Sequence, residues 1–341
     1  MRAVVVRGPR AGAVQDIAAP EAGEDEAVVE VAFTGICGTD YHVFDGDLGS
    51  TYPVVPGHEY SGTITAVGPT ARHHTWRLGD RVAVDPVLSC GACYRCLRHQ
   101  TNHCERAASP GDAMNGAFAE LIRVPLANLY RVEDHETLED AAFTEPLACA
   151  VWGIERLRPR PDDRALVFGA GPIGLLLGQL LNDRGVADVV LVDVAEAKLQ
   201  VARALGAHAT FTAGEALRGQ LEERTGGRGF DIVVDCTGIP AVIEGLFAHA
   251  GRAARIMFFG VAPASAEIAI RPFDVYRRDW EILGSMAING TFGQARRLLA
   301  AGRVSVSPLV SRVVGLDEVP AILGRAKLPT ELKTLVAPNP R

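Results

Sequence analysis

The sequence predicts a β-barrel domain followed by a doubly wound α/β domain. The chain has 341 residues, more than one hydrophobic core usually supports, so two domains are expected. In the first 145 residues or so, short β-rich segments alternate with glycine- and proline-containing turns, which is typical of an all-β barrel. From Ala165 onward, strand-like and helix-like runs alternate, which predicts a parallel sheet covered on both faces.

The first domain is predicted to comprise residues 1–147. Its clearest strand candidates are AVVEVAF (27–33), YSGTITAVG (60–68) and RVAVDPV (81–87). After about Met286, one helical run and short strands ending in LKTLVAP follow. Residues 287–341 are therefore predicted to rejoin the first domain.

The second domain is predicted to comprise residues 148–286 and to contain a six-stranded parallel sheet. Helix-like runs such as PIGLLLGQLLND and AEAKLQVARALG separate its strand candidates. The six candidates are ALVF (165–168), VVLVD (189–193), ATFT (209–212), DIVVD (231–235), ARIMFFG (254–260) and WEILGSM (280–286).

The composition restricts the partners and the compartment. A formal net charge of −7 leaves no basic face for nucleic acid or an anionic membrane, so small metabolites are the expected ligands. The apolar run at 165–181 holds four glycines and a proline and is shorter than the ~20 residues of a membrane span. The N-terminal MRAVVVRGPR lacks the features of a signal peptide. The protein is therefore predicted to be cytoplasmic, with its seven cysteines reduced.

A glycine-rich turn follows the first strand candidate of the second domain. Its glycines allow a tight turn, close approach of the backbone to a pyrophosphate, and close packing of helix on strand, while the helix N-terminus attracts phosphate. This turn predicts a dinucleotide site in a Rossmann-type domain. The residues assigned to it are Gly169, Gly171, Pro172, Ile173 and Gly174.

Asp193 ends the next strand candidate, 19 residues after Gly174. A carboxylate at this place accepts hydrogen bonds from the adenosine ribose and repels a 2′-phosphate, so NAD is predicted over NADP. Lys198 lies close enough along the chain to shield that charge, which weakens the preference. The alternative for Asp193 is a cap on the following helix.

Four cysteines are crowded into a segment at about 88–106, spaced C-x2-C-x2-C-x7-C. Four thiolates can surround one tetrahedral zinc ion and leave no position for a substrate, so a structural zinc site is predicted. An iron–sulfur cluster is the alternative. His99 and His103 are interpreted as solvated loop residues. The predicted ligands are Cys90, Cys93, Cys96 and Cys104.

An open metal site has to be assembled from residues far apart in the sequence. Cys37, His58 and Glu145 would supply one thiolate, one imidazole and one carboxylate, with room for water or an alcohol. Each has another reading, since Cys37 suits a buried small residue and Glu145 suits a helix N-terminus. Spacing alone does not decide between these readings.

Six motifs occur in an order that resembles the zinc-dependent medium-chain alcohol dehydrogenases. The resemblance covers the chain from end to end and is strongest to the polyol and sugar-alcohol branch. It implies a GroES-like barrel as the catalytic domain and a Rossmann coenzyme domain. The motifs are GICGTD (35–40), PGHEYSG (56–62), the four-cysteine segment, TEPLACAV (144–151), GAGPIG (169–174) and DCTG (235–238).

The resemblance implies that Cys37, His58 and Glu145 bind a catalytic zinc ion. Glu145 matches the polyol-type members, in which a glutamate ligates directly or through water, whereas other members use a second cysteine. Cys149, one helical turn further on, is the alternative ligand. Glu59 is expected either to support the ligands or to exchange with water as a ligand itself.

The resemblance also implies how protons and the cofactor are handled. A zinc ion lowers the pKa of a bound alcohol, which then releases hydride to the nicotinamide. Thr39 and His42 are implied as the proton relay to solvent. Asp40 is expected to hydrogen-bond the outer nitrogen of His58, and Lys333 is expected to contact the cofactor pyrophosphate.

The predicted function is a zinc- and NAD-dependent oxidoreductase that interconverts a secondary alcohol and its ketone. The alcohol is expected to be a polyol, a sugar alcohol or a cyclitol, and the assembly a homodimer or homotetramer. L-threonine 3-dehydrogenase and a simple secondary-alcohol dehydrogenase are the alternatives within the fold. A zinc-free reductase or a non-catalytic binding protein is the alternative outside it, although such relatives lack the three ligand residues.

Overall fold

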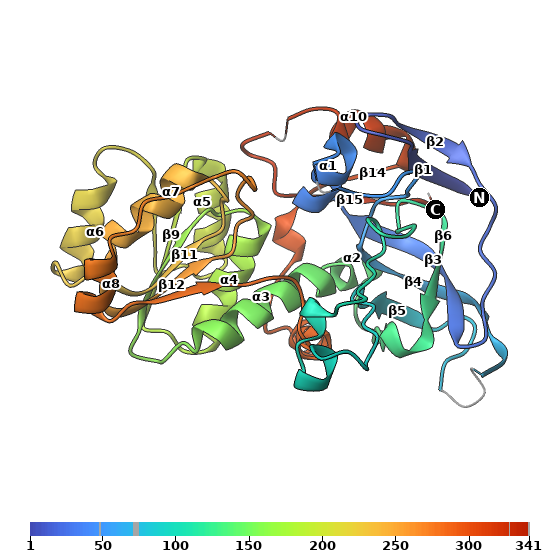
Figure 1. Ribbon diagram of the computed structural model, residues 1–341, viewed down its shortest axis with the longest axis horizontal. Coiled ribbons are helices and arrows are strands. Elements are labelled where there is room, and N and C mark those ends of the chain that lie inside the picture. Colours follow the sequence, from blue (N-terminus) through green and yellow to red (C-terminus); the bar gives the residue numbers. More distant parts are fainter. Residues whose placement is uncertain (48, 71–74, 327, 340–341) are drawn as a thin grey trace. The chain divides into compact units, whose positions relative to one another are not determined.

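The structure is a computed structural model that describes residues 1–47, 49–70, 75–326 and 328–339. The chain divides into two compact units (Figure 1). The first unit comprises Met1–Ala148 and Ile288–Arg341, and the second comprises Cys149–Ala287. Each division point lies one residue from the border predicted from the sequence.

The second unit contains a six-stranded, all-parallel sheet in the order β10-β9-β8-β11-β12-β13. Its central strands are nearly continuous runs of buried valine, leucine and isoleucine, as expected for a sheet covered on both faces. The predicted doubly wound fold is confirmed. The strands are β8 (Arg164–Phe168), β9 (Asp188–Asp193), β10 (Ala209–Thr212), β11 (Phe230–Asp235), β12 (Ala250–Phe258) and β13 (Glu281–Gly284).

Helices of the second unit follow the strands and pack on the sheet. Helix α4 packs against β8 and β9, α5 against β9 and β10, and α8 against β12. The buried core between these elements includes Leu166, Val233 and Ile256, which lie in three different strands. The helices are α4 (Pro172–Asp183), α5 (Glu196–Ala204), α6 (Leu217–Thr225), α7 (Pro240–Gly245) and α8 (Pro272–Arg278).

The first unit is built on a seven-stranded sheet and a two-stranded hairpin. In the larger sheet the order is β14-β15-β3-β4-β5-β7, and β6 also pairs with β3, at residues 26–30. All pairings except β14 with β15 are antiparallel. The strands are β1 (Arg2–Val6), β2 (Gly12–Asp16), β3 (Glu26–Gly35), β4 (Glu59–Val67), β5 (Arg81–Val84), β6 (Leu121–Pro125), β7 (Leu129–Arg131), β14 (Val310–Val314) and β15 (Lys333–Val336).

The strand predicted at 81–87 is shorter than expected. Strand β5 ends at Val84 because Pro86 has no N–H to donate to a neighbouring strand. The segment after it turns away from the sheet, and the Asp85 carboxylate accepts a hydrogen bond from the Val87 N–H (2.9 Å).

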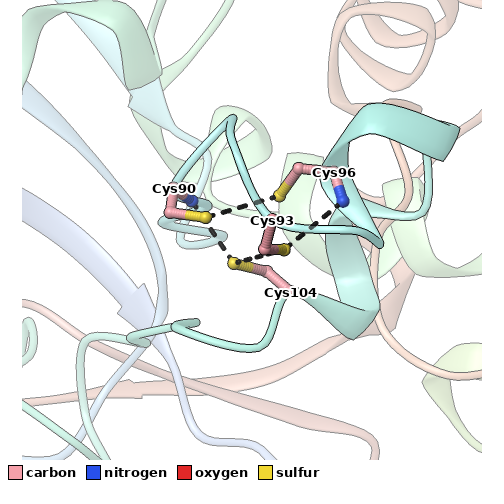
Figure 2. A group of neighbouring side chains, drawn as sticks. All are labelled: Cys90, Cys93, Cys96 and Cys104. Carbon is pink, nitrogen blue, oxygen red and sulfur yellow. Dashed lines mark hydrogen bonds between the residues drawn. The ribbon is translucent and has the colours of Figure 1, made fainter.

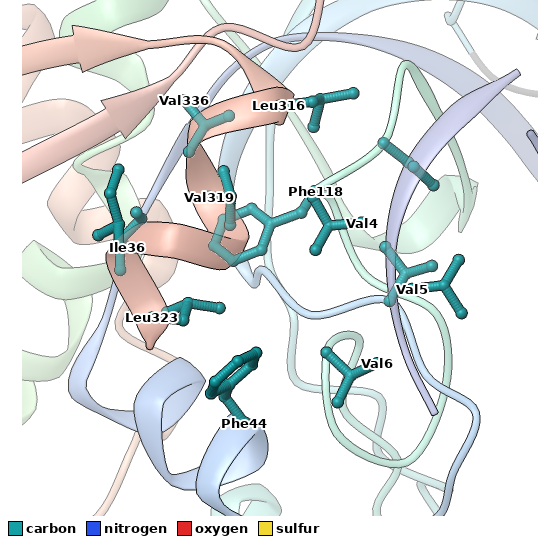
Figure 3. Close-up of a cluster of buried hydrophobic side chains, with 14 of the residues drawn as sticks. Val4, Val5, Val6, Ile36, Phe44, Phe118, Leu316, Val319, Leu323 and Val336 are labelled. Atoms are coloured by element: carbon teal, nitrogen blue, oxygen red, sulfur yellow. The ribbon is translucent and has the colours of Figure 1, made fainter. Parts of the chain in front are cut away.

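Both ends of the chain share one core in the first unit (Figure 3). Val4 and Val6 come from β1, Phe44 from α1, and Leu323 and Val336 from the C-terminal segment, and all are 4% exposed or less. The C-terminal strand β15 then pairs with β3, placing Leu335 opposite Gly35. The tail of the chain is therefore an internal strand of the first unit.

The helices of the first unit are short except for one that carries the chain toward the second unit. They are α1 (Gly38–Asp45), α2 (Leu138–Ala141), α3 (Thr144–Leu157), α9 (Phe292–Ala300) and α10 (Val319–Leu323). Among the described residues, none of the helices combines the length and apolarity that crossing a bilayer requires.

Candidate active site and metal centres

The four cysteines of the segment at 88–106 form one cluster. Their sulfur atoms lie within 4.8 Å of one another and converge on a common centre (Figure 2). The Cys90 and Cys96 sulfurs are 4.0 Å apart, and those of Cys93 and Cys104 are 3.9 Å apart. A tetrahedral ion with Zn–S bonds of about 2.3 Å would hold its sulfurs about 3.8 Å apart, so the donor set fits zinc.

Backbone N–H groups point at these sulfurs. The Cys90 N–H donates to the Cys104 sulfur (3.3 Å) and the Cys96 N–H donates to the Cys93 sulfur (3.5 Å). The Ala92 N–H lowers the pKa of the Cys90 thiol to about 6, whereas burial raises that of Cys96 to about 11. The seven cysteines all lie in described segments and none of them forms a disulfide, so no disulfide competes for these ligands.

A second cluster joins Cys37, His58 and Glu59. One ligand atom from each lies within 4.8 Å of the others. The pairing of β3 with β4 explains this, because it sets Gly35 opposite Glu59. Cys37 follows β3 by two residues and His58 immediately precedes β4, so the two side chains meet at one end of the strand pair.

The Glu59 carboxylate is buried in an ion pair with Lys333. The Lys333 ammonium lies 2.8 and 2.6 Å from the two carboxylate oxygens and donates to the Ile36 carbonyl (3.2 Å). Burial opposes both charges, but the pairing wins: the pKa of Glu59 is lowered and that of Lys333 is raised. A Cβ at Gly35 would lie 2.1 Å from a Glu59 oxygen, so only glycine leaves room for this carboxylate.

These contacts differ from the role that the resemblance implied for Lys333. The side chain is 6% exposed and its ammonium is occupied by Glu59, whereas a contact with the cofactor pyrophosphate was expected. Neither this ion pair nor the need for a glycine at position 35 was predicted from the sequence. The available signal was a lysine at the start of the short strand Lys333–Val336, close to the apolar Leu335 and Val336.

Asp40 connects the two loops of this cluster. Its side chain is fully buried and accepts hydrogen bonds from the Cys37 N–H (2.7 Å) and the Gly57 N–H (3.0 Å). The predicted hydrogen bond to His58 is not formed, because the nearest oxygen lies 3.7 Å from Nδ1. Asp40 acts on His58 through its charge and fixes the backbone on either side of the cluster.

His58 lies in a strongly negative environment. Burial works to lower its pKa, but a hydrogen bond with Cys37 and the negative charges of Cys37, Asp40 and Glu145 raise it well above the ordinary value. Glu145 is in the first turn of α3, 8% exposed, and also acts on Lys333. All three implied zinc ligands therefore contribute to the electrostatics of one site. Cys149 lies one turn further along α3.

Thr39 and His42 lie on helix α1, which begins directly after Cys37. The Thr39 hydroxyl is 3.8 Å from the Cys37 sulfur. The His42 Nδ1 atom lies 3.0 Å from both carboxylate oxygens of Asp47, and the histidine side chain is 42% exposed. Helix α1 thus leads from a cluster ligand to a histidine in contact with solvent.

The glycine-rich turn of the second unit has the geometry of a phosphate-binding loop. Gly169 has φ +97°, and a Cβ at Gly174 would lie 1.8 Å from the Gly169 carbonyl oxygen. Gly171 is the N-cap of α4 and Pro172 opens it, followed by Ile173. No atom would lie within 4 Å of a Cβ at Gly171, so the surface there is open to a ligand.

Asp193 ends β9 beside this turn. Its carboxylate accepts hydrogen bonds from the N–H of Ala170 (2.7 Å) and from the N–H of Ala195 (2.9 Å). Ala195 is the N-cap residue of α5. The carboxylate therefore holds the turn and the residues that lead into α5. It does not cap that helix, since the N-cap is Ala195 and has no side-chain capping bond. Lys198 lies on α5, partly exposed.

Cys236 follows β11 and burial raises its pKa well above the ordinary value, as suits a packing residue.

Family models match segments in both halves of the chain. Residues 23–134 match the family model of the alcohol dehydrogenase GroES-like domain, and residues 172–301 match that of the zinc-binding dehydrogenases. The chain belongs to the zinc-binding dehydrogenase family. Members of this family are oxidoreductases, and zinc and a nicotinamide cofactor belong to their chemistry.

Relatives of this zinc-binding dehydrogenase act on sugar alcohols. The chain is 37% identical to D-altritol 5-dehydrogenase of Agrobacterium fabrum over 86% of each chain. It is 31% identical to D-arabinitol dehydrogenase 1 of Uromyces fabae over 99% of this chain and 97% of that one. A crystal structure assigned as a zinc-binding dehydrogenase of Sinorhizobium meliloti 1021, bound to NADP, has a TM-score of 0.94 with 30% identity over 99% of each chain.

Proposed function

We propose that this zinc-binding dehydrogenase oxidises a secondary alcohol of a polyol, sugar alcohol or cyclitol to its ketone, and catalyses the reverse reaction, with NAD(H). The observation that carries the proposal is the cluster of Cys37, His58 and Glu59 beside a negatively charged Glu145. These groups match a three-ligand zinc site with an open position. The sugar-alcohol relatives support the substrate class.

Two zinc ions per chain are proposed. Cys90, Cys93, Cys96 and Cys104 would hold one in a closed shell. Cys37, His58 and Glu145 would hold the other, Glu145 either directly or through water. The pair with Lys333 supports Glu59 as a neighbour of that ion, since its charge is already neutralised.

The chain's own residues would position the substrate and move its proton. Zinc supplies a Lewis acid that lowers the pKa of the alcohol, and NAD supplies the hydride acceptor. Thr39 lies beside Cys37 and would accept the proton through its hydroxyl. His42, on the same helix and exposed, would exchange the proton with solvent, and Asp47 would hold its ring in place.

NAD is proposed over NADP because the Asp193 carboxylate lies beside the phosphate-binding turn and forms no ion pair with any described residue. Each of its oxygens accepts one N–H, which leaves lone pairs for the ribose hydroxyls. Asp193→Asn removes the charge and one of the two acceptor oxygens, so the NAD over NADP ratio of kcat/KM should fall. A wild-type ratio near one would contradict the proposal, and the NADP-bound relative makes this measurement necessary.

A homodimer or homotetramer in the cytoplasm is also proposed. Strand β13 is an edge strand of the six-stranded sheet and exposes Glu281 and Ile282, so a partner strand could pair with it. Seven described cysteines without a disulfide are consistent with a reducing compartment. Sedimentation of the purified protein tests the assembly, and a monomer would contradict it.

The substrate class is tested with a panel of polyols, sugar alcohols, cyclitols, L-threonine and simple alcohols, following NADH formation by absorbance. The proposal expects the largest kcat/KM for a compound with several hydroxyl groups. A clear preference for L-threonine or for a simple alcohol would contradict it. Zinc content is measured on the same protein, because one zinc per chain would contradict the two-site arrangement even if activity is present.

A further inference from the structure

A hollow lined by arginines lies at the amino-terminal edge of the six-stranded sheet. Its volume is about 900 Å³. It is bounded by the starts of β8, β11 and β12, by the turn at 226–229 and by helix α8. The glycine-rich turn lies at the carboxyl end of β8, so the hollow and the dinucleotide site are at opposite edges of the sheet.

The hollow carries an excess of positive charge. Five arginines and three aspartates line it, a formal difference of +2 in a chain whose net charge is −7. The lining arginines are Arg164, Arg228, Arg252, Arg277 and Arg278, and the aspartates are Asp162, Asp231 and Asp274.

Part of the negative charge is already engaged. An oxygen of Asp231 accepts the backbone N–H of Arg164 (2.8 Å). Asp274 lies 3.7 Å from the guanidinium of Arg271, which is not among the lining residues. Among the described residues, none of these aspartates forms an ion pair with an arginine that lines the hollow.

Three of the five guanidinium groups have no partner among the described residues. Those of Arg228, Arg252 and Arg277 make no ion pair and no hydrogen bond with any other described residue. By contrast, Arg278 bonds the Ala250 carbonyl (3.4 Å) and stacks on a tryptophan, and Arg164 bonds the Thr225 carbonyl (3.3 Å). The N–H groups of these three guanidinium groups are therefore available to donate hydrogen bonds to a ligand.

The backbone holds two of these arginines close together. Thr225, 1% exposed, accepts the Gly229 N–H through its hydroxyl (3.3 Å) and so fixes the turn that bears Arg228. A Cβ at Gly251 would lie 2.8 Å from the Arg228 carbonyl, so this turn touches the residue just before Arg252. The backbones of Arg228 and Arg252 are therefore neighbours, and an anion bound in the hollow would lie within reach of positive charge from both segments.

We propose that this hollow binds a small multivalent anion with two or more phosphoryl groups, separately from the dinucleotide site. Planar guanidinium groups match phosphate oxygens in pairs, which favours this class over a single halide or a metal ion. A volume of about 900 Å³ suits a small organic molecule rather than one orthophosphate. The inference is independent of the substrate proposed above.

Calorimetric titration with inorganic pyrophosphate tests the site. The protein is first saturated with NADH, so that pyrophosphate cannot occupy the glycine-rich turn. The variant Arg228→Ala/Arg252→Ala/Arg277→Ala removes the three unpartnered groups, all of them exposed. The control Arg184→Ala/Arg203→Ala/Arg218→Ala removes the same charge from the same unit at residues paired with Glu155, Glu196 and Glu222.

One pyrophosphate per chain is expected to bind to the wild type and to the control. Binding to the first variant should be weaker by roughly tenfold or more, because the loss of even one charge-assisted hydrogen bond lowers the affinity by about this factor. Equal losses in both variants would show a general charge effect and overturn the proposal. So would the absence of binding to the wild type, or an affinity for pyrophosphate no greater than for orthophosphate.

Discussion

The two ligand clusters of the first unit are built in opposite ways. The four cysteines lie within fifteen residues of one another, and their segment has no buried hydrophobic cluster beyond the cysteines themselves. The cluster of Cys37, His58 and Glu59 is assembled by strand pairing and is supported by Lys333 from the far end of the chain. One cluster organises a loop, whereas the other is organised by the fold.

Because of this difference, we expect the four-cysteine cluster to stabilise its segment and the assembled cluster to serve catalysis. A loop without a core depends on its metal for its structure, and a closed shell of four thiolates leaves no place for a substrate. A cluster already held by a sheet and by buried charges keeps its geometry without a fourth ligand. The two sites should therefore respond differently to the same chemical change.

The largest effect is expected from Cys37→Ser, which removes one ligand of the assembled site. Loss of the Lewis acid should lower kcat/KM on the order of a thousandfold or more, since it provides several kcal/mol of transition-state stabilisation. Zinc should fall from two to one per chain while the melting temperature changes little. Retention of most activity would show that Cys37 is not a ligand of the catalytic ion.

The same substitution in the other cluster, Cys93→Ser, should give the opposite pattern. The segment at 88–106 would lose its organising ion, and the melting temperature should fall on the order of 10 °C. The activity of the remaining folded molecules, at a temperature well below the transition, should stay within a small factor of wild type. A loss of activity at an unchanged melting temperature would contradict the structural role.

Local features of both clusters were predictable from the sequence, but long-range contacts were not. The six parallel strands and the four-cysteine spacing depend on neighbours along the chain, and the structure shows them as predicted. The pair of Glu59 with Lys333 depends on β15 lying beside β3. No periodicity encodes that register, because a strand's apolar pattern gives its faces and not its neighbour.

The predicted hydrogen bond between Asp40 and His58 is not formed, and the reason is again a contact with residues that the sequence does not place. The Asp40 side chain had two backbone donors within reach, Cys37 and Gly57, which the sequence alone does not place. A buried carboxylate takes such N–H donors because unpaired polar groups are costly. The sequence did contain one signal for the bond to Cys37. Asp40 is the third residue of a helix whose N-cap is Cys37, a position from which a carboxylate accepts the N-cap N–H.

Lys333→Met distinguishes the observed ion pair from the implied cofactor contact. It leaves the Glu59 carboxylate buried without its partner, which should cost on the order of 3 kcal/mol in the free energy of unfolding. Adding Glu59→Gln should recover part of that loss, because no charge is then left unpaired. An unchanged melting temperature together with a raised KM for NAD would instead favour the pyrophosphate contact.

His42→Ala tests how the assembled site exchanges protons with solvent. A lost relay should lower kcat by about a hundredfold, with partial rescue by imidazole buffer and little change in melting temperature. His103→Ala, an exposed histidine within the four-cysteine segment, is the matched control and should be silent. Equal kcat values for both variants would remove His42 from the mechanism.

The smallest effect concerns the connection of the four-cysteine segment to the sheet. Burial raises the pKa of Asp85, which follows β5, to about 6, above the value of about 3.9 in an unfolded chain. The folded state therefore binds the proton more tightly, and stability falls as pH rises between these two values. Asp85→Asn keeps an acceptor for the Val87 N–H and removes the charge.

This variant should be more stable than wild type at pH 8, on the order of 2 kcal/mol, and equal to it near pH 4. Asp80→Asn is the control of opposite sign, because the hydrogen bond from Arg131 lowers the pKa of Asp80 and stabilises the folded state at neutral pH. Melting temperatures measured from pH 4 to 8 compare all three proteins. A less stable Asp85→Asn at pH 8 would mean that the carboxylate's charge, and not only its oxygen, holds the start of the four-cysteine segment.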